Sequence, residues 1–189
     1  AVVDLEDAER GEVLLFEDLG TNVAMDLGAM MGYAPAPDFF ADCEVVVHQR
    51  ILNHRVAPCP MEPRAVASVW GADGRLTHWA STQAPHSLRD SMAAALGVEP
   101  SKIRVIAPDV GGGFGCKIMF YPEEVLIPYA ALTLGRPVKW TEDRIEHFIG
   151  TNHERLQIHD AEIAVDTEGR ILGVRDIFLH DAGAYTPYG

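Results

Sequence analysis

The sequence predicts an α+β fold, a two-layer domain with a mixed β-sheet and helices on one face. Two apolar runs, 64–70 and 76–81, flank a glycine-containing turn and indicate a β-hairpin. Two helical stretches, 85–96 and 122–134, alternate with further short apolar runs. Because each helix and strand has an apolar face to bury, these elements are expected to pack as a helical layer on a sheet.

The predicted strands follow in chain order. Cys43 to Val56 is rich in Val and Ile with partial alternation, which predicts a long strand. Gly-Ala-Asp-Gly at 71–74 turns the hairpin, and Ile103–Ala107 and Val138–Thr141 are short buried strands. A last hairpin spans 154–181. In its first strand the apolar residues change from even to odd positions, so they would lie on opposite faces of a regular strand. This change predicts a bulge near Asp160.

Both predicted helices have clear ends. In 85–96, Leu88, Met92 and Leu96 share one face, and Gly97 is a favourable stop. The second helix begins near Pro122, with two glutamates that suit the positive end of the helix dipole. It contains a proline at 128, where we expect a kink, and a glycine at 135 ends it.

The chain divides by composition near residue 40. Residues 1–40 are acidic and irregular, with a Pro- and Gly-containing loop at 32–37, and we interpret them as a connector from a preceding domain. Residues 41–189 carry the predicted elements. The chain has no initiator Met and stops at Thr186-Pro-Tyr-Gly189 without a terminal helix. We therefore expect a piece of a longer protein.

The charge and composition exclude several classes of protein. A net charge of −13 argues against a nucleic-acid partner, which would favour a basic face. No apolar run reaches the ~18 residues of a membrane-spanning helix, and the N-terminus lacks the features of a signal peptide. The three cysteines fit no disulfide pattern, which favours a cytoplasmic location. His48, His54, Cys43 and Cys59 lack the paired spacing of a metal site.

The strongest functional signal is the loop Gly111-Gly-Gly-Phe-Gly-Cys-Lys117, between a predicted strand and a predicted helix. Consecutive glycines allow close approach of a ligand, and the free N–H groups of such a loop can bind an anion. A phosphate-binding P-loop would require a glycine directly before Lys117 and a hydroxyl in place of Ile118. A dinucleotide fingerprint fails because Cys116 replaces its last glycine.

Residues 110–117 resemble the Gly-Gly-Gly-Phe-Gly-x-Lys loop of the molybdopterin-binding subunit in the xanthine dehydrogenase, aldehyde oxidase and carbon monoxide dehydrogenase family. The likeness covers roughly residues 15–189. Phe120-Tyr-Pro122 is closest to the carbon monoxide dehydrogenase-like branch. Other segments similar to the family are Met61-Glu-Pro-Arg64, Ser81-Thr-Gln83, Gly135-Arg-Pro-Val-Lys139 and Glu142-Asp-Arg144.

The resemblance implies that residues 41–189 form the first part of a molybdenum cofactor-binding domain. The parent would be a molybdenum hydroxylase that oxidises a small organic substrate, or CO, with water-derived oxygen. Its cofactor would be molybdenum–molybdopterin, with the cytosine dinucleotide form left open. FAD and 2Fe-2S clusters would lie on other domains or subunits, which would be partners together with the remainder of the large subunit. The family's general base lies downstream, so we expect no catalytic residue or direct metal ligand here, and an inactive isolated chain.

The resemblance also assigns cofactor-binding residues. Gln83 matches the glutamine whose amide hydrogen-bonds an oxygen on molybdenum; the alternative is that it caps the next helix. Phe114 matches the phenylalanine whose backbone touches the same region. Gly112, Gly113 and Gly115 would let the chain pass close to the pterin and the metal.

Two loop positions differ from the family pattern. Purine-oxidising members have a substrate-binding glutamate after the lysine, where this chain has Ile118, so we expect a substrate other than a purine. Cys116 replaces a usual Gly or Asn, as a small filler or as a thiol facing the metal pocket. The alternative for the whole chain is a non-catalytic scaffold or binding module on the same fold.

Overall fold

The computed structural model describes residues 2–34, 36 and 38–183. The chain folds into two compact units, one of Ala57–Glu154 and one of Ala1–Val56 with Arg155–Gly189. The predicted chain end at 186–189, and Pro35 and Pro37 of the predicted loop, lie outside the described residues. The division into a connector over 1–40 and a domain over 41–189 stays a prediction.

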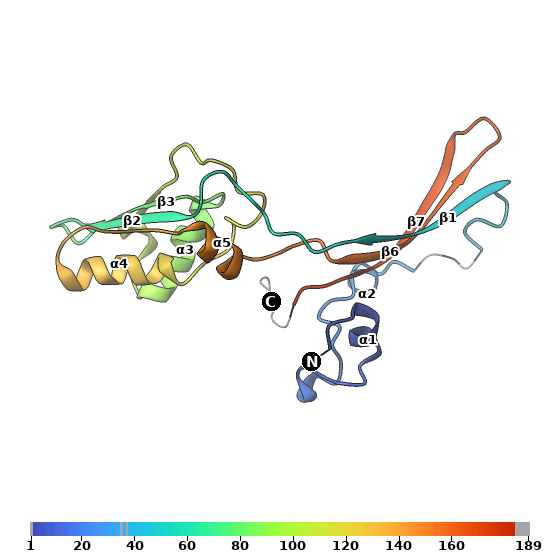
Figure 1. The fold of residues 1–189 in the computed structure, drawn as a ribbon, viewed down its shortest axis with the longest axis horizontal. Helices are drawn as coiled ribbons and strands as arrows, with labels where there is room; N and C mark the ends of the chain where they lie inside the picture. The colour runs from blue at the N-terminus through green and yellow to red at the C-terminus, as the bar shows by residue number, and fades with distance from the viewer. Residues whose placement is uncertain (1, 35, 37, 184–189) are drawn as a thin grey trace. The chain divides into compact units, whose positions relative to one another are not determined.

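The unit Ala57–Glu154 has the predicted two layers. Its sheet runs in the order β4-β3-β2-β5, with β3 and β4 parallel and the other neighbours antiparallel. Two longer helices, α3 and α4, lie on one face of this sheet (Figure 1). The elements are β2 (Ala65–Trp70), β3 (Leu76–Ala80), α3 (Pro85–Leu96), η2 (Pro100–Lys102), β4 (Ile103–Ile106), α4 (Glu123–Leu134), β5 (Val138–Thr141) and α5 (Arg144–Gly150). The α+β class with a mixed sheet is confirmed.

The core of this unit lies between the sheet and α3. Leu76 and Met92 are fully buried, and burial of each such side chain stabilises the fold by about 1.5–3 kcal/mol. Trp70 and Trp140 pack against this core. Trp79 does not, because strand alternation turns it to the other face of β3, where it is 40% exposed. The buried cluster consists of Val66, Leu76, Ala80, Leu88, Met92, Ala93 and Ile103.

The helix α5 was not predicted from the sequence. It begins after Asp143, whose side chain accepts the Glu146 N–H, while Glu146 accepts the Asp143 N–H. This reciprocal capping box stabilises a helix of only seven residues. The helix is too short for its apolar periodicity to be recognised.

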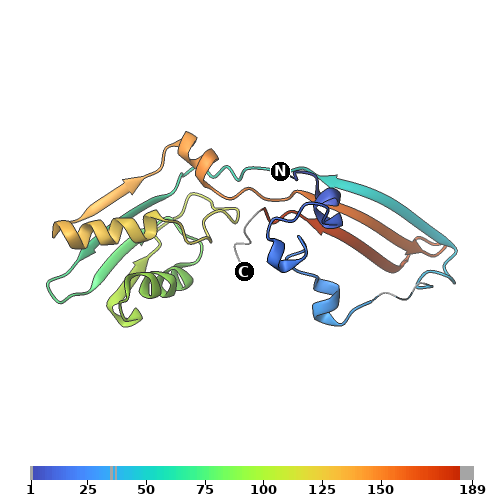
Figure 2. The same cartoon turned by 90° about the horizontal axis from the view of Figure 1, so that it is seen from below.

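The second unit holds a three-stranded antiparallel sheet in the order β1-β6-β7, with the long strands side by side in Figure 2. Short helices precede the sheet in the segment that was interpreted as irregular. They begin after Asp4 and Asp26, whose carboxylates accept helix N–H groups, and end at glycines. The elements are α1 (Leu5–Arg10), η1 (Glu17–Leu19), α2 (Leu27–Met31), β1 (Val45–Asn53), β6 (Gln157–Val165) and β7 (Ile171–His180).

The predicted bulge near Asp160 is wrong. The strand β6 pairs with β1 without interruption from Gln157 to Val165, and the irregularity in its pairing with β7 lies between Ala164 and Val165. Nearly every residue of β6 is half-buried, so neither face has to collect all of the apolar side chains. Among the helices of the described residues, none combines the length and the apolar character that spanning a bilayer requires.

Candidate functional site

The segment Ser81–Gln83 connects β3 to α3 and meets the glycine loop. The Gln83 N–H donates to the Lys117 carbonyl (3.0 Å), and the Thr82 hydroxyl donates to the same carbonyl (3.1 Å). The Gln83 side-chain oxygen, Oε1, accepts the N–H groups of Gly115 (3.0 Å) and Lys117 (3.3 Å). The structure therefore brings Gln83 and the loop together, although a helix and a strand separate them in sequence.

The side chain of Gln83 does not cap α3. That helix begins after Ala84, and no side-chain hydrogen bond caps it. Because Oε1 accepts two loop N–H groups, the amide nitrogen Nε2 is the end of the side chain that remains for other partners. Within the part of the chain that the structure describes, no acceptor receives Nε2 or the backbone N–H of Gly113 or Phe114.

Two glycines of the loop are required by the protein itself. A Cβ at Gly113 would lie 2.2 Å from Gln83 Oε1, and a Cβ at Gly111 would lie 2.6 Å from Glu62 Cβ. Gly112 and Gly115 have positive φ values of 93° and 91°, which side-chain-bearing residues rarely adopt. Close packing of Glu62 and Gln83 thus accounts for part of the glycine run that suggested a ligand.

Phe114 has a φ of 52° and a side chain that is 65% exposed. A left-handed conformation at a bulky residue is uncommon, and such strain is often found at ligand sites. It is accompanied here by the two successive N–H groups of Gly113 and Phe114. Such pairs of N–H groups form anion- and oxygen-binding concavities.

Glu62 lies in the family-like segment Met61–Arg64, but the motif alone does not predict a role for it in the site. Its Oε2 atom accepts from the Ser81 hydroxyl (2.8 Å), the Gly111 N–H (2.7 Å) and the Lys117 ammonium (2.9 Å). Desolvation opposes ionisation of this carboxyl, but the hydrogen bonds from Lys117, Ser81 and Gly111 outweigh it and lower its pKa. The sequence offers one indication of this contact. Lys117 ends a loop that contains no acidic residue, so its ammonium needs a carboxylate from another segment.

A buried ion-pair network lies beside this site. The Arg64 guanidinium binds Glu142 (2.6 Å) and Glu123, and Glu142 also contacts His147 Nδ1 (2.8 Å). Burial raises the pKa of Glu142. The hydrogen bonds with Arg64 and His147 lower this pKa by more than burial raises it, so the net shift is downward. Arg64 also stacks on the Tyr121 ring, 3.7 Å from its centroid. Because Glu123 is the first residue of α4, this network joins the start of that helix to Arg64 and Glu142.

The two loop positions that differ from the family pattern have different environments. Ile118 is 41% exposed, so it can border a pocket. Cys116 is 1% exposed, and burial raises the pKa of its thiol above the ordinary value. A buried, protonated thiol is a packing group, which favours the small-filler interpretation of Cys116.

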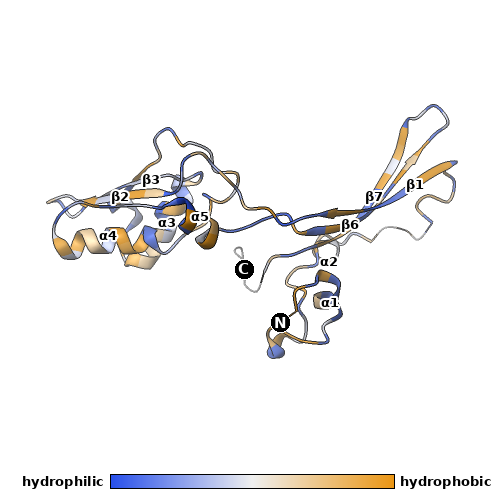
Figure 3. Cartoon of the chain, viewed as in Figure 1, coloured by the Kyte–Doolittle hydropathy of each residue, from blue (hydrophilic) through white to orange (hydrophobic). Residues whose placement is uncertain are grey.

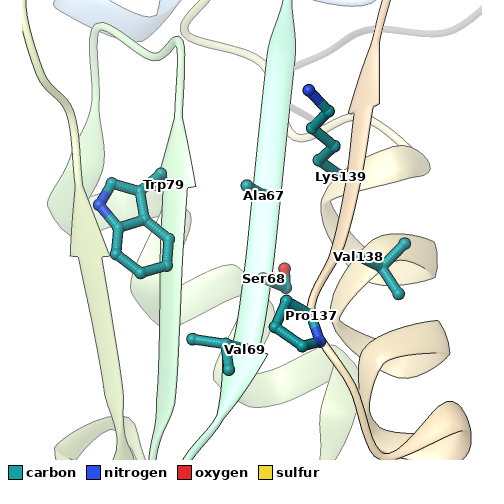
Figure 4. A pocket seen from close by; sticks show the side chains of 7 residues that line it. All are labelled: Ala67, Ser68, Val69, Trp79, Pro137, Val138 and Lys139. Carbon is teal, nitrogen blue, oxygen red and sulfur yellow. The ribbon is translucent and has the colours of Figure 1, made fainter.

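The other candidate sites lack comparable chemistry. A pocket of about 400 Å³ on β2, β3 and β5 includes the exposed Trp79 and Lys139, and none of the predicted site residues lines it (Figure 4). In residues 2–34, 36 and 38–183, no group of three or more His, Cys, Asp or Glu side chains could hold a metal ion.

The donors at Gln83 and the loop fit an oxygen-rich cofactor. An amide Nε2 and two backbone N–H groups supply hydrogen-bond donors without a formal charge, and none of the described residues accepts from them. The fold, with a glycine loop and a glutamine side chain brought together at one site, is typical of a cofactor-binding domain. Residues 15–189 match the model of the molybdopterin cofactor-binding domain, and the chain belongs to this family.

Comparisons with individual proteins agree with the family. The chain is 38% identical, over 97% of its length, to the 6-hydroxypseudooxynicotine dehydrogenase complex subunit gamma of Paenarthrobacter nicotinovorans, of which it covers 23%. It is 42% identical, over 77% of its length, to the carbon monoxide dehydrogenase large chain of Hydrogenophaga pseudoflava, of which it covers 18%. The structure matches reconstituted CO dehydrogenase from Oligotropha carboxidovorans with a TM-score of 0.72 and 32% identity, covering 94% of this chain and 24% of that one.

The chain therefore spans about a fifth of the length of the curated relatives that it matches.

Proposed function

We propose that this chain supplies one wall of the cofactor pocket in the large subunit of a molybdenum hydroxylase. The observation that carries the proposal is the orientation of Gln83. Its Oε1 atom is held by the N–H groups of Gly115 and Lys117, which leaves Nε2 to donate to an oxygen of the cofactor. When bound, the cofactor supplies the redox centre that accepts electrons from the substrate.

The residues of this chain bind and orient the cofactor. Gln83 Nε2 and the N–H groups of Gly113 and Phe114 act as donors, while Gly112 and Gly115 give the loop the positive φ values that shape it. None of these residues is a catalytic acid or base, and none is a metal ligand. The general base and the rest of the pocket belong to other parts of the parent protein in this proposal.

The substrate proposed for the parent is a small molecule other than a purine. Ile118 places an exposed apolar side chain where purine-oxidising members have a glutamate. The two relatives compared above are named for 6-hydroxypseudooxynicotine and carbon monoxide, and neither of these is a purine. We further propose that electrons leave through 2Fe-2S and FAD partners, since one relative is a subunit of a complex and the other is a large chain.

Two substitutions of Gln83 in the full-length parent test the proposal. Gln83→Glu retains an oxygen for the N–H groups of Gly115 and Lys117 but removes the Nε2 donor, whereas Gln83→Ala removes both. A hydrogen bond to a charged, oxygen-rich centre is worth on the order of 1.5–3 kcal/mol, or about one to two decades in rate. Both variants should lose turnover by this amount while remaining folded. Full activity in both would refute the assigned role.

A further inference from the structure

The contacts of Glu62 connect three separate segments through a single carboxylate oxygen. Glu62 precedes β2, Ser81 follows β3, and Gly111 and Lys117 are the first and last residues of the glycine loop. The Glu62 N–H also donates to the Gly111 carbonyl at 3.3 Å, so backbone and side chain hold the same glycine. A carboxylate oxygen that accepts three donors fixes all three relative to one another.

Lys117 depends on this carboxylate. Its side chain is fully buried, with 0% exposure, whereas the side chain of Glu62 is 37% exposed. Glu62 Oε2 lies 2.9 Å from the Lys117 ammonium and forms an ion pair with it. A buried ammonium without a counter-ion is unfavourable, so the loop would rearrange to bring Lys117 to water if Glu62 lost its charge.

The same lysine supports the site directly. Its carbonyl accepts from the Gln83 N–H and the Thr82 hydroxyl, and its own N–H donates to Gln83 Oε1. Movement of Lys117 would therefore release the Gln83 amide, which forms no contact with Glu62 among the interactions that the structure shows. The Glu62 carboxylate therefore acts on Gln83 indirectly, through Lys117.

We propose that Glu62 is a positioning residue, which holds both ends of the glycine loop and thereby sets the Gln83 amide and the N–H groups of Gly113 and Phe114 toward the cofactor. This inference rests on the proposed function for its ligand, but the geometry of the loop can be measured without any cofactor. In this proposal Glu62 acts through the loop and Gln83, and it is therefore not a catalytic residue.

The test compares hydrogen exchange and molybdenum content in variants of the full-length parent. Glu62→Gln retains the shape of the side chain and loses its charge. We expect backbone amides in 111–117 to exchange about tenfold faster, while those of α3 are unchanged. We also expect molybdenum retention to weaken about tenfold, as commonly follows loss of a group that orients a site.

Glu142→Gln is the matched control. It removes the charge of another glutamate in a buried ion pair of the same unit, and the hydrogen bonds and ion pairs that the described residues give Glu142 go to Arg64 and His147, outside the loop 111–117. It should lower thermal stability without accelerating exchange in the loop. The double variant Glu62→Gln, Lys117→Met removes both charges, and it should recover stability while the loop amides remain fast and molybdenum remains low.

The possible outcomes separate this inference from the proposed function. Wild-type exchange in the loop of Glu62→Gln overturns the positioning role, whatever the cofactor content. Full recovery of loop protection in the double variant also overturns it, because Glu62 would then only neutralise Lys117. If the parent purified after expression with molybdate contains no molybdenum, the proposed function fails, yet faster loop exchange in Glu62→Gln still supports positioning by Glu62.

Discussion

At the scale of single residues, Glu124 is a buried acid whose environment opposes its charge. It lies in the first turn of α4, 6% exposed, and its carboxylate accepts the Tyr121 N–H. Desolvation is the main reason that its pKa rises to about 7. An acid with a raised folded-state pKa is ionised more easily in the unfolded chain. Its ionisation therefore lowers the free energy of unfolding as the pH rises.

We therefore predict that Glu124→Gln stabilises the 189-residue chain at neutral pH. Between the ordinary pKa of 4.5 and about 7, ionisation of Glu124 increasingly favours the unfolded state. Above that range the resulting loss of stability has reached its full size. The full shift corresponds to an upper limit of about 3 kcal/mol. Thermal unfolding at pH 5 and pH 8 should show a larger gain at pH 8. Glu99→Gln, at an exposed position, should give no such difference, and an equal gain at both pH values would contradict the prediction.

Ile118 gives a prediction about substrate choice. We expect the parent enzyme to oxidise xanthine poorly, because a purine N–H facing this apolar side chain is left unsatisfied at a cost of about 1–3 kcal/mol per group. Ile118→Glu should raise kcat/KM for xanthine, and Ile118→Leu should not. Rapid xanthine oxidation by the wild type, unaffected by Ile118→Glu, would show that this position does not set specificity.

At the scale of elements, Gly113 tests how tightly the loop packs on Gln83. An alanine Cβ at this position would overlap Gln83 Oε1 at 2.2 Å and force the amide to move. We predict that Gly113→Ala in the parent lowers turnover by about one decade or more, in line with loss of an oriented donor. Gly150→Ala is the control, since its Cβ would meet only an Arg64 nitrogen at 3.9 Å. Equal activities of the two variants would argue against the site.

The elements that were predicted correctly are those whose signal is local. The helix α3 spans the predicted Pro85–Leu96 because its apolar spacing, its first proline and Gly97 all act within about twelve residues. The β2–β3 hairpin likewise follows from one turn. The helix α5 depends on a capping box over less than two turns, and the apolar pattern of β6 was misleading because both of its faces are half-buried.

The candidate site was predictable only in part, because several of its contacts join residues that are distant in sequence. The motifs drew attention to Gln83 and to the glycine loop, and the structure places them in contact. The role of Glu62 depends on pairings across 49 and 55 positions of sequence, which no local pattern encodes. Whether Oε1 or Nε2 of Gln83 is left for a ligand also depends on distant partners, the N–H groups of Gly115 and Lys117, and not on residue type.

At the scale of the whole molecule, apolar surface remains exposed. Much of α4 is apolar in Figure 3, and Leu126, Leu132 and Leu134 on it are more than half exposed. Exposed apolar groups of this extent usually face another part of a protein. Because the chain covers about a fifth of the relatives, we propose that other parts of a longer protein cover this surface.

We predict that the isolated chain retains little or no molybdenum cofactor. A buried cofactor needs polar contacts from several directions, and a single wall leaves it solvated and weakly held. Metal analysis of the purified 189-residue chain, expressed with molybdate, checks this against the full-length parent prepared in the same way. Stoichiometric molybdenum in the fragment would refute the prediction.

The Glu62 carboxylate has a consequence for protein engineering. Residues 111–117 are held in shape by the side chains of Gln83 and Glu62, whose hydrogen bonds to the loop span 32 to 55 positions of sequence. A heptapeptide transplanted alone into a foreign scaffold would carry the glycines without the groups that bend them. A graft would need at least Met61–Arg64, Ser81–Gln83 and Gly111–Lys117 together.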